Sequence, residues 1–295
     1  MKKLRIIALL LAVMLTVALM ASCASEDPSD ANQPATENIV VIGPSVTEIV
    51  VALGLGDSII GTDDFSALID GVPSDIPIFN MWGLDAEQLI ALQPDILIVT
   101  EMVMNMLGND PLRVFSDIGT ELHYVASSAS IEGIAEDIRF VAEVLDRESR
   151  GEELIADMMQ IIDEIRAIGE TITDRRTVYI EINPAPSMFS LGRGTFLNEM
   201  IEIIGAVNVF ADEDGWISVS DEAIITIDPD VILSTSEDAV GAVDEIIGRP
   251  GWSHLTAVQN GDVFRIDADS ASRSNHNIVI ALREMAVAVY PEYFR

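Results

Sequence analysis

The sequence predicts an α/β protein made of two βαβ lobes that are joined by one long α-helix. Three observations favour this fold class: an uninterrupted amphipathic helical pattern near the middle of the chain, apolar runs that alternate with helical patterns on both sides of it, and a repeat that the two halves share. Strands that are apolar throughout, separated by helices, are typical of parallel sheets covered on both faces.

The central helix is predicted from Asp146 to Ile172, where acids and arginines fill the positions between apolar residues. The apolar residues recur at steps of three and four, which is the helical period: Leu154, Met158, Ile161, Ile162, Ile165, Ile168 and Ile172. At 1.5 Å per residue, about 24 helical residues span roughly 36 Å, which is longer than one small domain needs. The alternative is a long surface helix of a single domain. We interpret the pattern as a rigid strut that carries two lobes.

Strands and helices alternate on each side of this helix. Before it, we expect strands at residues 39–43, 58–61, 95–100 and 122–125, and helices at 47–53, 84–92, 112–118 and 131–145. After it, we expect strands at 177–182, 207–210, 231–235 and 262–266, and helices at 196–204, 222–227, 243–247 and 278–289. The predicted lobes are therefore residues 39–145 and 173–295, with residues 146–172 as the connecting helix.

The two halves contain related segments. LDAEQLIALQPDILIVT (residues 84–100) aligns with VSDEAIITIDPDVILST (residues 219–235), and Glu87 and Glu222 each lie seven residues before a proline. Each segment describes a short amphipathic helix that a proline stops and that leads into a buried strand. Two lobes of the same construction follow from this repeat.

The start of the chain has the features of an export signal. Lys2, Lys3 and Arg5 precede an apolar run that ends before Ala21-Ser22-Cys23, which predicts a signal peptide over residues 1–22. The apolar run is shorter than the about 20 residues that span a membrane. Cys23 is the only cysteine, and MASC resembles the bacterial lipobox, in which the cysteine is lipidated and becomes the first mature residue. Residues 23–38 then read as the lipidated cysteine and a flexible tether.

The composition limits the partners. The formal net charge is −33, and this charge opposes binding to nucleic acid or to anionic lipid headgroups. We expect no nucleic-acid partner, and contact with the membrane through the lipid anchor only. The expected location is extracytoplasmic, lipid-anchored to the bacterial cell membrane.

Several blocks of the sequence together resemble one protein family. In order they are IGPSVTEIVVALGLGDSIIGTDDFS, LDAEQLIALQPDILIVT, GTFLNEMIEIIGAVNVF, W-x-x-V-S-x-E-A and RPGWSHLTAVQNGDVFRID. They are similar to blocks of the helical-backbone substrate-binding proteins of ABC importers for metal chelates, namely cobalamin, ferric siderophores and haem. The resemblance covers residues 39–295. It implies the helical-backbone periplasmic-binding-protein fold, with two Rossmann-like lobes that face each other across a shallow cleft.

The resemblance also implies the partners. The ligand would be a small-molecule metal chelate containing cobalt or iron, and the protein would be a monomer that delivers it to an ABC importer permease and its ATPase. No resident cofactor and no catalytic role are implied. An extracellular enzyme or adhesin is the alternative class, but the sequence contains neither a phosphate loop nor a G-x-S-x-G elbow. A free-metal binder would need about three convergent ligands, for which the sequence offers no obvious set.

Candidate ligand-binding residues come from three sources. In α/β lobes, binding loops follow the carboxyl ends of strands, and this rule selects Pro44, Ser45, Asp64, Phe65, Glu101, Met102, Ser236, Glu237 and the segment from Asp269 to His276. The family resemblance adds Met81, Trp82, Trp216 and Arg273, and the Gly-Arg-Gly sequence adds Arg193.

Each candidate has an alternative role. Trp82 and Trp216 lie in glycine-bearing segments, where we favour stacking on a corrin, porphyrin or catecholate ring over core packing. Arg193 is either a surface charge or a contact for an anionic ligand. His276 could ligate iron or cobalt, although an exposed histidine at a helix start is the simpler interpretation. The family segment R-P-G-P-R reads Arg273-Ser-Asn-His-Asn277 here, without its prolines and second arginine.

Two further expectations concern ligand and docking. Haem-binding members of the family use a Met and a His from opposite lobes, but Glu237 occupies the second-lobe position, which disfavours haem. The scarcity of arginines favours cobalamin or another corrinoid over anionic siderophores. Family members also place one acid near the tip of each lobe against permease arginines, and the matching candidates are Asp70 and Asp269.

Overall fold

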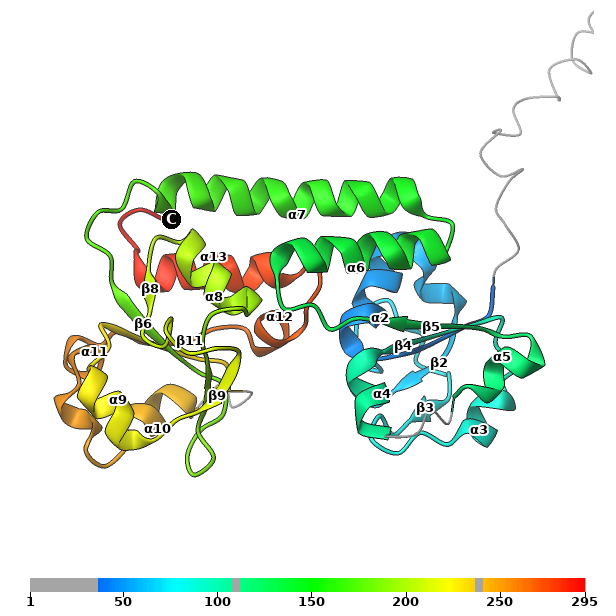
Figure 1. The fold of residues 1–295 in the computed structure, drawn as a ribbon, viewed down its shortest axis with the longest axis horizontal. Coiled ribbons are helices and arrows are strands. Elements are labelled where there is room, and N and C mark those ends of the chain that lie inside the picture. The colour runs from blue at the N-terminus through cyan, green and yellow to red at the C-terminus, as the bar shows by residue number, and fades with distance from the viewer. Residues whose placement is uncertain (1–36, 108–111, 237–240, 295) are drawn as a thin grey trace, which may run out of the picture. The chain divides into compact units, whose positions relative to one another are not determined.

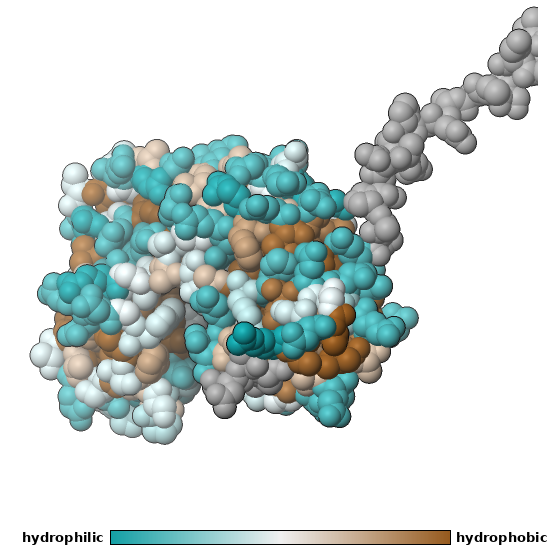
Figure 2. All heavy atoms as spheres, turned by 45° about the vertical axis from the view of Figure 1, so that its right-hand side comes forward, coloured by the Kyte–Doolittle hydropathy of each residue, from teal (hydrophilic) through white to brown (hydrophobic). Residues whose placement is uncertain are grey.

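The computed structural model describes residues 37–107, 112–236 and 241–294. The predicted signal peptide, Cys23 and Glu237 lie outside these residues. The described residues from Asn38 onward form one compact unit, which contains two α/β lobes and a long helix that runs beside both (Figure 1). Figure 2 shows one face of the molecule, on which hydrophilic residues surround smaller hydrophobic patches. The predicted fold class is confirmed. None of the helices in the described part of the chain combines the length and the apolar character that crossing a membrane requires.

The first lobe is built on a parallel sheet in the order β3-β2-β1-β4-β5. Its strands are β1 (Ile39–Ile42), β2 (Ile59–Asp63), β3 (Ile78–Phe79), β4 (Ile96–Thr100) and β5 (Glu121–Val125). Its helices are α2 (Pro44–Val50), α3 (Ala86–Ile90), α4 (Glu101–Leu107), α5 (Val114–Ile118) and α6 (Ile131–Val144), and a π turn and a 3-10 turn (Val51–Leu55, Gly56–Ser58) follow α2.

The second lobe is built on a parallel sheet in the order β11-β10-β6-β8, beside an antiparallel pair of β7 and β9. The strands are β6 (Thr177–Glu181), β7 (Phe189–Leu191), β8 (Val207–Asn208), β9 (Trp216–Ser218), β10 (Val231–Ser234) and β11 (Val263–Arg265). The helices are α8 (Phe196–Ile203), α9 (Asp221–Ile227), α10 (Ala242–Gly248), α11 (Thr256–Asn260), α12 (Ala268–Ser272) and α13 (Ile278–Val289), and a 3-10 turn (Trp252–His254) precedes α11.

The central strands β1, β4 and β10 are buried along their whole length, and their successive side chains lie on opposite faces of the sheet. In β1, Ile39 and Val41 pack on one side, whereas Val40 and Ile42 pack on the other. The largest apolar cluster includes one face of each main sheet together with buried residues of α6, α7, α8 and α13. One continuous core therefore extends from the first lobe, along the long helix, into the second lobe.

The long helix is α7, Glu148–Gly169. Figure 1 shows it running past both lobes, next to α6 at one end and α13 at the other. Two glycines let the backbone of α7 approach α6 and α8 closely. A Cβ on Gly151 would lie 2.5 Å from the Cβ of Ala142 in α6. A Cβ on Gly169 would lie 2.1 Å from the carbonyl oxygen of Ile203 in α8. The strut is thus fixed closely to each lobe.

The shared repeat corresponds to the same local structure in both lobes. Asp85 caps α3 by accepting a hydrogen bond from the amide of Glu87, and Ser220 caps α9 by accepting one from the amide of Ala223. Each helix then leads into a central strand, β4 or β10.

The structure departs from the prediction mainly in short elements. The strands β3, β7 and β9 and the helices α4, α11 and α12 were not predicted, since runs of two to seven residues carry too little periodicity to identify. The predicted helix at 47–53 begins earlier, at Pro44, because proline suits the first turn of a helix. Trp216 lies on strand β9 rather than in a loop.

A candidate ligand-binding cleft between the lobes

Two pockets are lined by residues from both lobes. The first has a volume of about 270 Å³ and is called here the Trp216 pocket; its lining residues are Pro44, Ser45, Thr100, Met102, Ser127, Ser128, Ala129, Phe196, Trp216, Ser272, Arg273 and Ser274. The second has a volume of about 590 Å³ and is called the Glu48 pocket; its lining residues are Glu48, Val51, Ala52, Asp64, Phe65, Leu68, Ile69, Asp70, Asp269, Arg273, His276 and Asn277. Because Arg273 lines both, we treat them together as the interlobe cleft.

The turn that carries Pro44 and Ser45 into the cleft depends on two residues. Gly43 has a φ of 121°, and a Cβ there would lie 2.4 Å from the side chain of Thr100, so only glycine fits. The buried carboxylate of Asp63 accepts a hydrogen bond of 2.7 Å from the amide of Gly43 and one of 2.6 Å from the hydroxyl of Ser66. Asp63 therefore connects the ends of β1 and β2.

Three aromatic side chains of the predicted site are exposed. The ring of Phe65 meets that of Trp82 edge to face, with centroids 5.9 Å apart, and the two residues are 46% and 48% exposed. Trp216, from the other lobe, is 47% exposed. Large aromatic surface in water is unfavourable unless something covers it. These rings are therefore suited to stack on a ligand.

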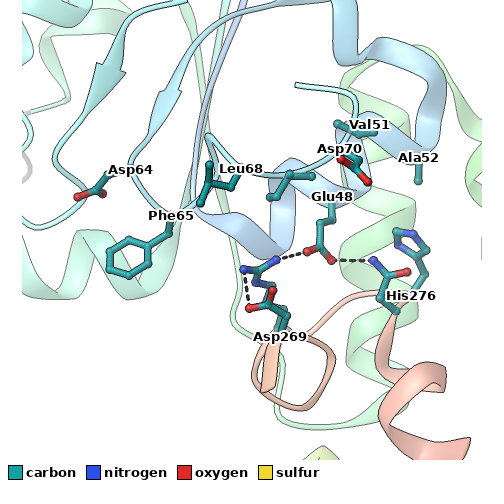
Figure 3. Close-up of a pocket in the computed structure, with 12 residues that line it drawn as sticks. Glu48, Val51, Ala52, Asp64, Phe65, Leu68, Asp70, Asp269 and His276 are labelled. Atoms are coloured by element: carbon teal, nitrogen blue, oxygen red, sulfur yellow. Dashed lines mark hydrogen bonds and ion pairs between the residues drawn. The ribbon is translucent and has the colours of Figure 1, made fainter. Parts of the chain in front are cut away.

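A buried carboxylate joins the two lobes. Glu48 on α2 pairs with Arg273 and accepts hydrogen bonds of 2.7 Å from each of the side-chain amides of Asn275 and Asn277. Figure 3 shows Glu48 with two of these interactions drawn as dashed lines. The side chain of Glu48 is only 11% exposed. We call Glu48, Arg273, Asn275 and Asn277 the Glu48 clamp.

The clamp changes the interpretation of Arg273. Its guanidinium pairs with Glu48 and also, at 2.7 Å, with Asp269. The positive charge of Arg273 is therefore already shared by two carboxylates, although its side chain lines both pockets. The sequence pointed to Arg273 as a contact for ligand, but gave no signal that its acceptor lies 225 residues away in the other lobe.

One predicted contact is wrong. Met81 is 1% exposed and packs in the core of the first lobe with Val40 and Phe79, so its thioether cannot face the cleft. Trp82 is the next residue and is 48% exposed. It lies in a turn that is closed by a hydrogen bond from the amide of Gly83 to the carbonyl oxygen of Asn80.

Other candidates lie outside the lining of the two pockets. Arg193 is exposed and forms a bidentate ion pair with Asp214, at 2.7 and 3.0 Å. Glu101 is exposed at the start of α4. Ser236 is half-buried, and its carbonyl oxygen accepts a hydrogen bond from Arg265. Arg193 nevertheless lies close in the fold to Trp216, because Leu191 pairs with Trp216 and Arg193 bridges to Asp214. Trp82 also lines neither pocket and meets the cleft through its ring contact with Phe65.

His276 lines the Glu48 pocket, and burial is the main cause that lowers the pKa of its imidazole. The ring is therefore neutral at pH 7. Its Nδ1 is buried and has no hydrogen-bond partner within the described residues. Those residues also contain no cluster of three or more His, Cys, Asp or Glu side chains that could hold a metal ion.

Two buried polar groups lie at or beside the Trp216 pocket. The Thr100 hydroxyl, in a residue that is 2% exposed, has no hydrogen-bond partner in the described structure. Asp137 bonds to Ser128, which lines the pocket, and burial raises the pKa of this carboxyl to about 6. A buried polar group without a partner costs free energy that a ligand could recover.

Comparison with known proteins places this geometry in a family. A family model for periplasmic binding proteins matches residues 39–270. YvrC of Bacillus subtilis, an ABC transporter substrate-binding lipoprotein, is 31% identical over 88% of this chain and 82% of its own length. A vitamin B12-binding protein of Vibrio parahaemolyticus is 26% identical over 86% of this chain and 90% of its own. The solved apo structure of the periplasmic haem-binding protein RhuT from Roseiflexus sp. RS-1 is 27% identical, with a TM-score of 0.74 over 87% of this chain and 99% of that one.

The chain therefore belongs to the periplasmic binding protein family. It is a substrate-binding protein of the ABC transporter class, and an extracytoplasmic location follows from that class. The resemblance inferred from the sequence blocks is confirmed.

Proposed function

We propose that this protein captures a metal chelate, either a corrinoid such as cobalamin or a ferric siderophore, in the interlobe cleft. It delivers this ligand to the permease and ATPase of an ABC importer, and lipidated Cys23 holds it at the membrane. The observation that carries the proposal is the cleft itself, which both lobes line and which presents exposed aromatic rings from each. Flat aromatic surface is suited to the large ring or ligand shell of a metal chelate.

Haem is the second candidate. The similarity to RhuT supports it, as does His276, because a neutral imidazole is the form that ligates iron. A corrinoid is favoured by the engagement of Arg273 with Glu48 and Asp269, which leaves its charge less available for an anionic ligand.

A thermal-shift screen tests the proposal with cyanocobalamin, haemin and a panel of ferric siderophores. A ligand that binds only the folded state adds about 2.7 kcal/mol of stability at 100 times its Kd, which raises the Tm. If none of these chelates raises the Tm at any concentration, the proposed ligand class is wrong.

Removing either exposed tryptophan should weaken chelate binding. Trp82→Ala and Trp216→Ala are each expected to cost about 1–3 kcal/mol of binding free energy, as the loss of an aromatic anchor does, with little change in stability. Titration calorimetry measures the affinity for the chelate, and chemical denaturation measures the free energy of unfolding. The matched control is Trp252→Ala, a fully buried tryptophan whose truncation should instead cost about 3–5 kcal/mol of stability. Unchanged affinity in both exposed-site variants would show that these rings do not contact the ligand.

Docking on the permease is predicted to use exposed acids. Asp70 and Asp269 are both exposed and lie on opposite lobes, although they line the same Glu48 pocket. Asp70→Arg and Asp269→Arg should each reduce stimulation of the importer ATPase, because a carboxylate buried against a permease arginine contributes about 2–5 kcal/mol to a complex. ATPase activity is measured at saturating ligand, so that altered ligand affinity does not enter, and Glu143→Arg on α6 is the exposed control. Full stimulation by both variants would remove these residues from the interface.

The anchor is predicted to depend on Cys23, which precedes the described residues. Cys23→Ala should prevent lipidation, so that the protein is released in soluble form or stays uncleaved rather than becoming a lipid-anchored mature protein. Membrane fractionation and mass spectrometry of the N-terminus measure the outcome. Equal membrane fractions of the mature form in both versions would exclude lipid anchoring at this residue.

A further inference from the structure

The charges that line the cleft are unbalanced. The Glu48 pocket has four carboxylates in its lining, from Glu48, Asp64, Asp70 and Asp269, and one permanent cation, Arg273. Figure 3 shows Asp64 apart from Glu48 and Asp269. Arg273 pairs with both Glu48 and Asp269. His276 adds no positive charge, because burial lowers the pKa of its imidazole. The lining of this pocket is therefore net negative at neutral pH.

The Trp216 pocket is neutral except for the same arginine. Its polar lining consists of serine hydroxyls and the buried hydroxyl of Thr100. The Thr100 oxygen is buried and lacks a partner within the described residues, so the polar groups that this pocket offers to a ligand are mainly the serine hydroxyls. Neutral donors and acceptors, rather than ionic groups, are the natural partners of this surface.

We infer that the cleft selects metal chelates whose outer surface is uncharged or cationic, and that it discriminates against anionic chelates. This inference rests on the proposed function and narrows its ligand class. An anionic ligand would meet the carboxylates of Asp64 and Asp70 without a free cation in the described lining to compensate them. A neutral ligand rich in amides, or one with an ammonium group, avoids this repulsion.

The sharpest test is a charge series on one chelate. Ferrioxamine B carries a free ammonium group; N-acetylation removes that charge and N-succinylation replaces it with a carboxylate, while the iron–hydroxamate core stays the same. Cyanocobalamin and its monocarboxylate, made by hydrolysing one propionamide, provide a second pair. Affinity should fall about three- to tenfold for each step toward negative charge at low salt, and the steps should shrink at high salt. The affinity for haemin, which carries two carboxylates, is measured in the same way for comparison.

Variants identify the source of the discrimination. Asp70→Asn and Asp269→Asn should each reduce the ratio between neutral and anionic affinities, because each removes one rim carboxylate. Glu143→Gln, an exposed acid on α6, should leave the ratio unchanged. Equal or tighter binding of the anionic member of a pair overturns the inference while the proposed function stands. Preferential binding of haemin overturns the inference and replaces the corrinoid or siderophore with the second candidate ligand. Failure of every chelate to bind refutes the proposed function, and the inference falls with it.

Discussion

Replacing Arg249 by alanine is expected to lower the free energy of unfolding by about 3–5 kcal/mol, the usual cost of leaving one member of a buried ion pair alone. Arg249 donates hydrogen bonds of 2.7 and 3.0 Å to the two carboxylate oxygens of Glu181, and both side chains are at most 5% exposed. The guanidinium also lies 4.2 Å from the centroid of the Trp252 ring. The variant would leave Glu181 buried without its counter-ion.

The loss should depend on pH. Burial raises the pKa of Glu181 even with Arg249 present, and removing the arginine raises it further. A carboxyl whose folded-state pKa is raised favours folding at low pH, and this contribution is lost as the pH rises through the folded-state value. The variant should therefore be closer to the wild type near pH 4.5 than at pH 7.

Urea denaturation at the two pH values measures both effects. The control is Arg193→Ala, which removes an arginine from an exposed pair with Asp214, and this change should cost about 0–1 kcal/mol at either pH. If the two variants lost the same free energy of unfolding, the buried ion pair of Arg249 would contribute no more to stability than the exposed pair of Arg193.

The second large effect is expected at the junction of the lobes. Glu48→Ala should lower the free energy of unfolding by about 2–4 kcal/mol, because it removes the acceptor of Arg273, Asn275 and Asn277 together. The segment between α12 and α13 loses its attachment to the first lobe, so amide hydrogen exchange at residues 273–277 should become faster.

Denaturation and hydrogen-exchange mass spectrometry measure these changes. Glu143→Ala replaces an exposed helical glutamate of the same lobe and should stay within about 0.5 kcal/mol of the wild type. Wild-type exchange at residues 273–277 in the Glu48 variant would mean that the clamp does not hold the two lobes together.

Local patterns were enough to predict the scaffold. The apolar runs that became β1, β4, β6 and β10 are buried on both faces, and such runs have few alternatives to a central parallel strand. The long helix could be predicted because its apolar residues recur with the helical period over many turns. The short strands β7 and β9, which position Trp216, carry no comparable signal.

The site was only partly predictable, because its contacts are distant in sequence. Pro44, Phe65 and Met102 do line the two pockets, in agreement with the rule that binding loops follow strand ends. Trp216, which the family resemblance selected, lines one of them as well. The clamp joins Glu48 to partners more than 220 residues away, and no local pattern specifies such a pairing.

The attachment of α7 to both lobes has a consequence for transport. Backbone contacts at Gly151 and Gly169, and a core that runs through the helix, leave little freedom for the lobes to swing on ligand entry. The free-energy cost of changing the protein's conformation on ligand binding is then small. Empty and loaded forms would then present nearly the same outline to a transporter, which would have to distinguish them by the ligand in the cleft.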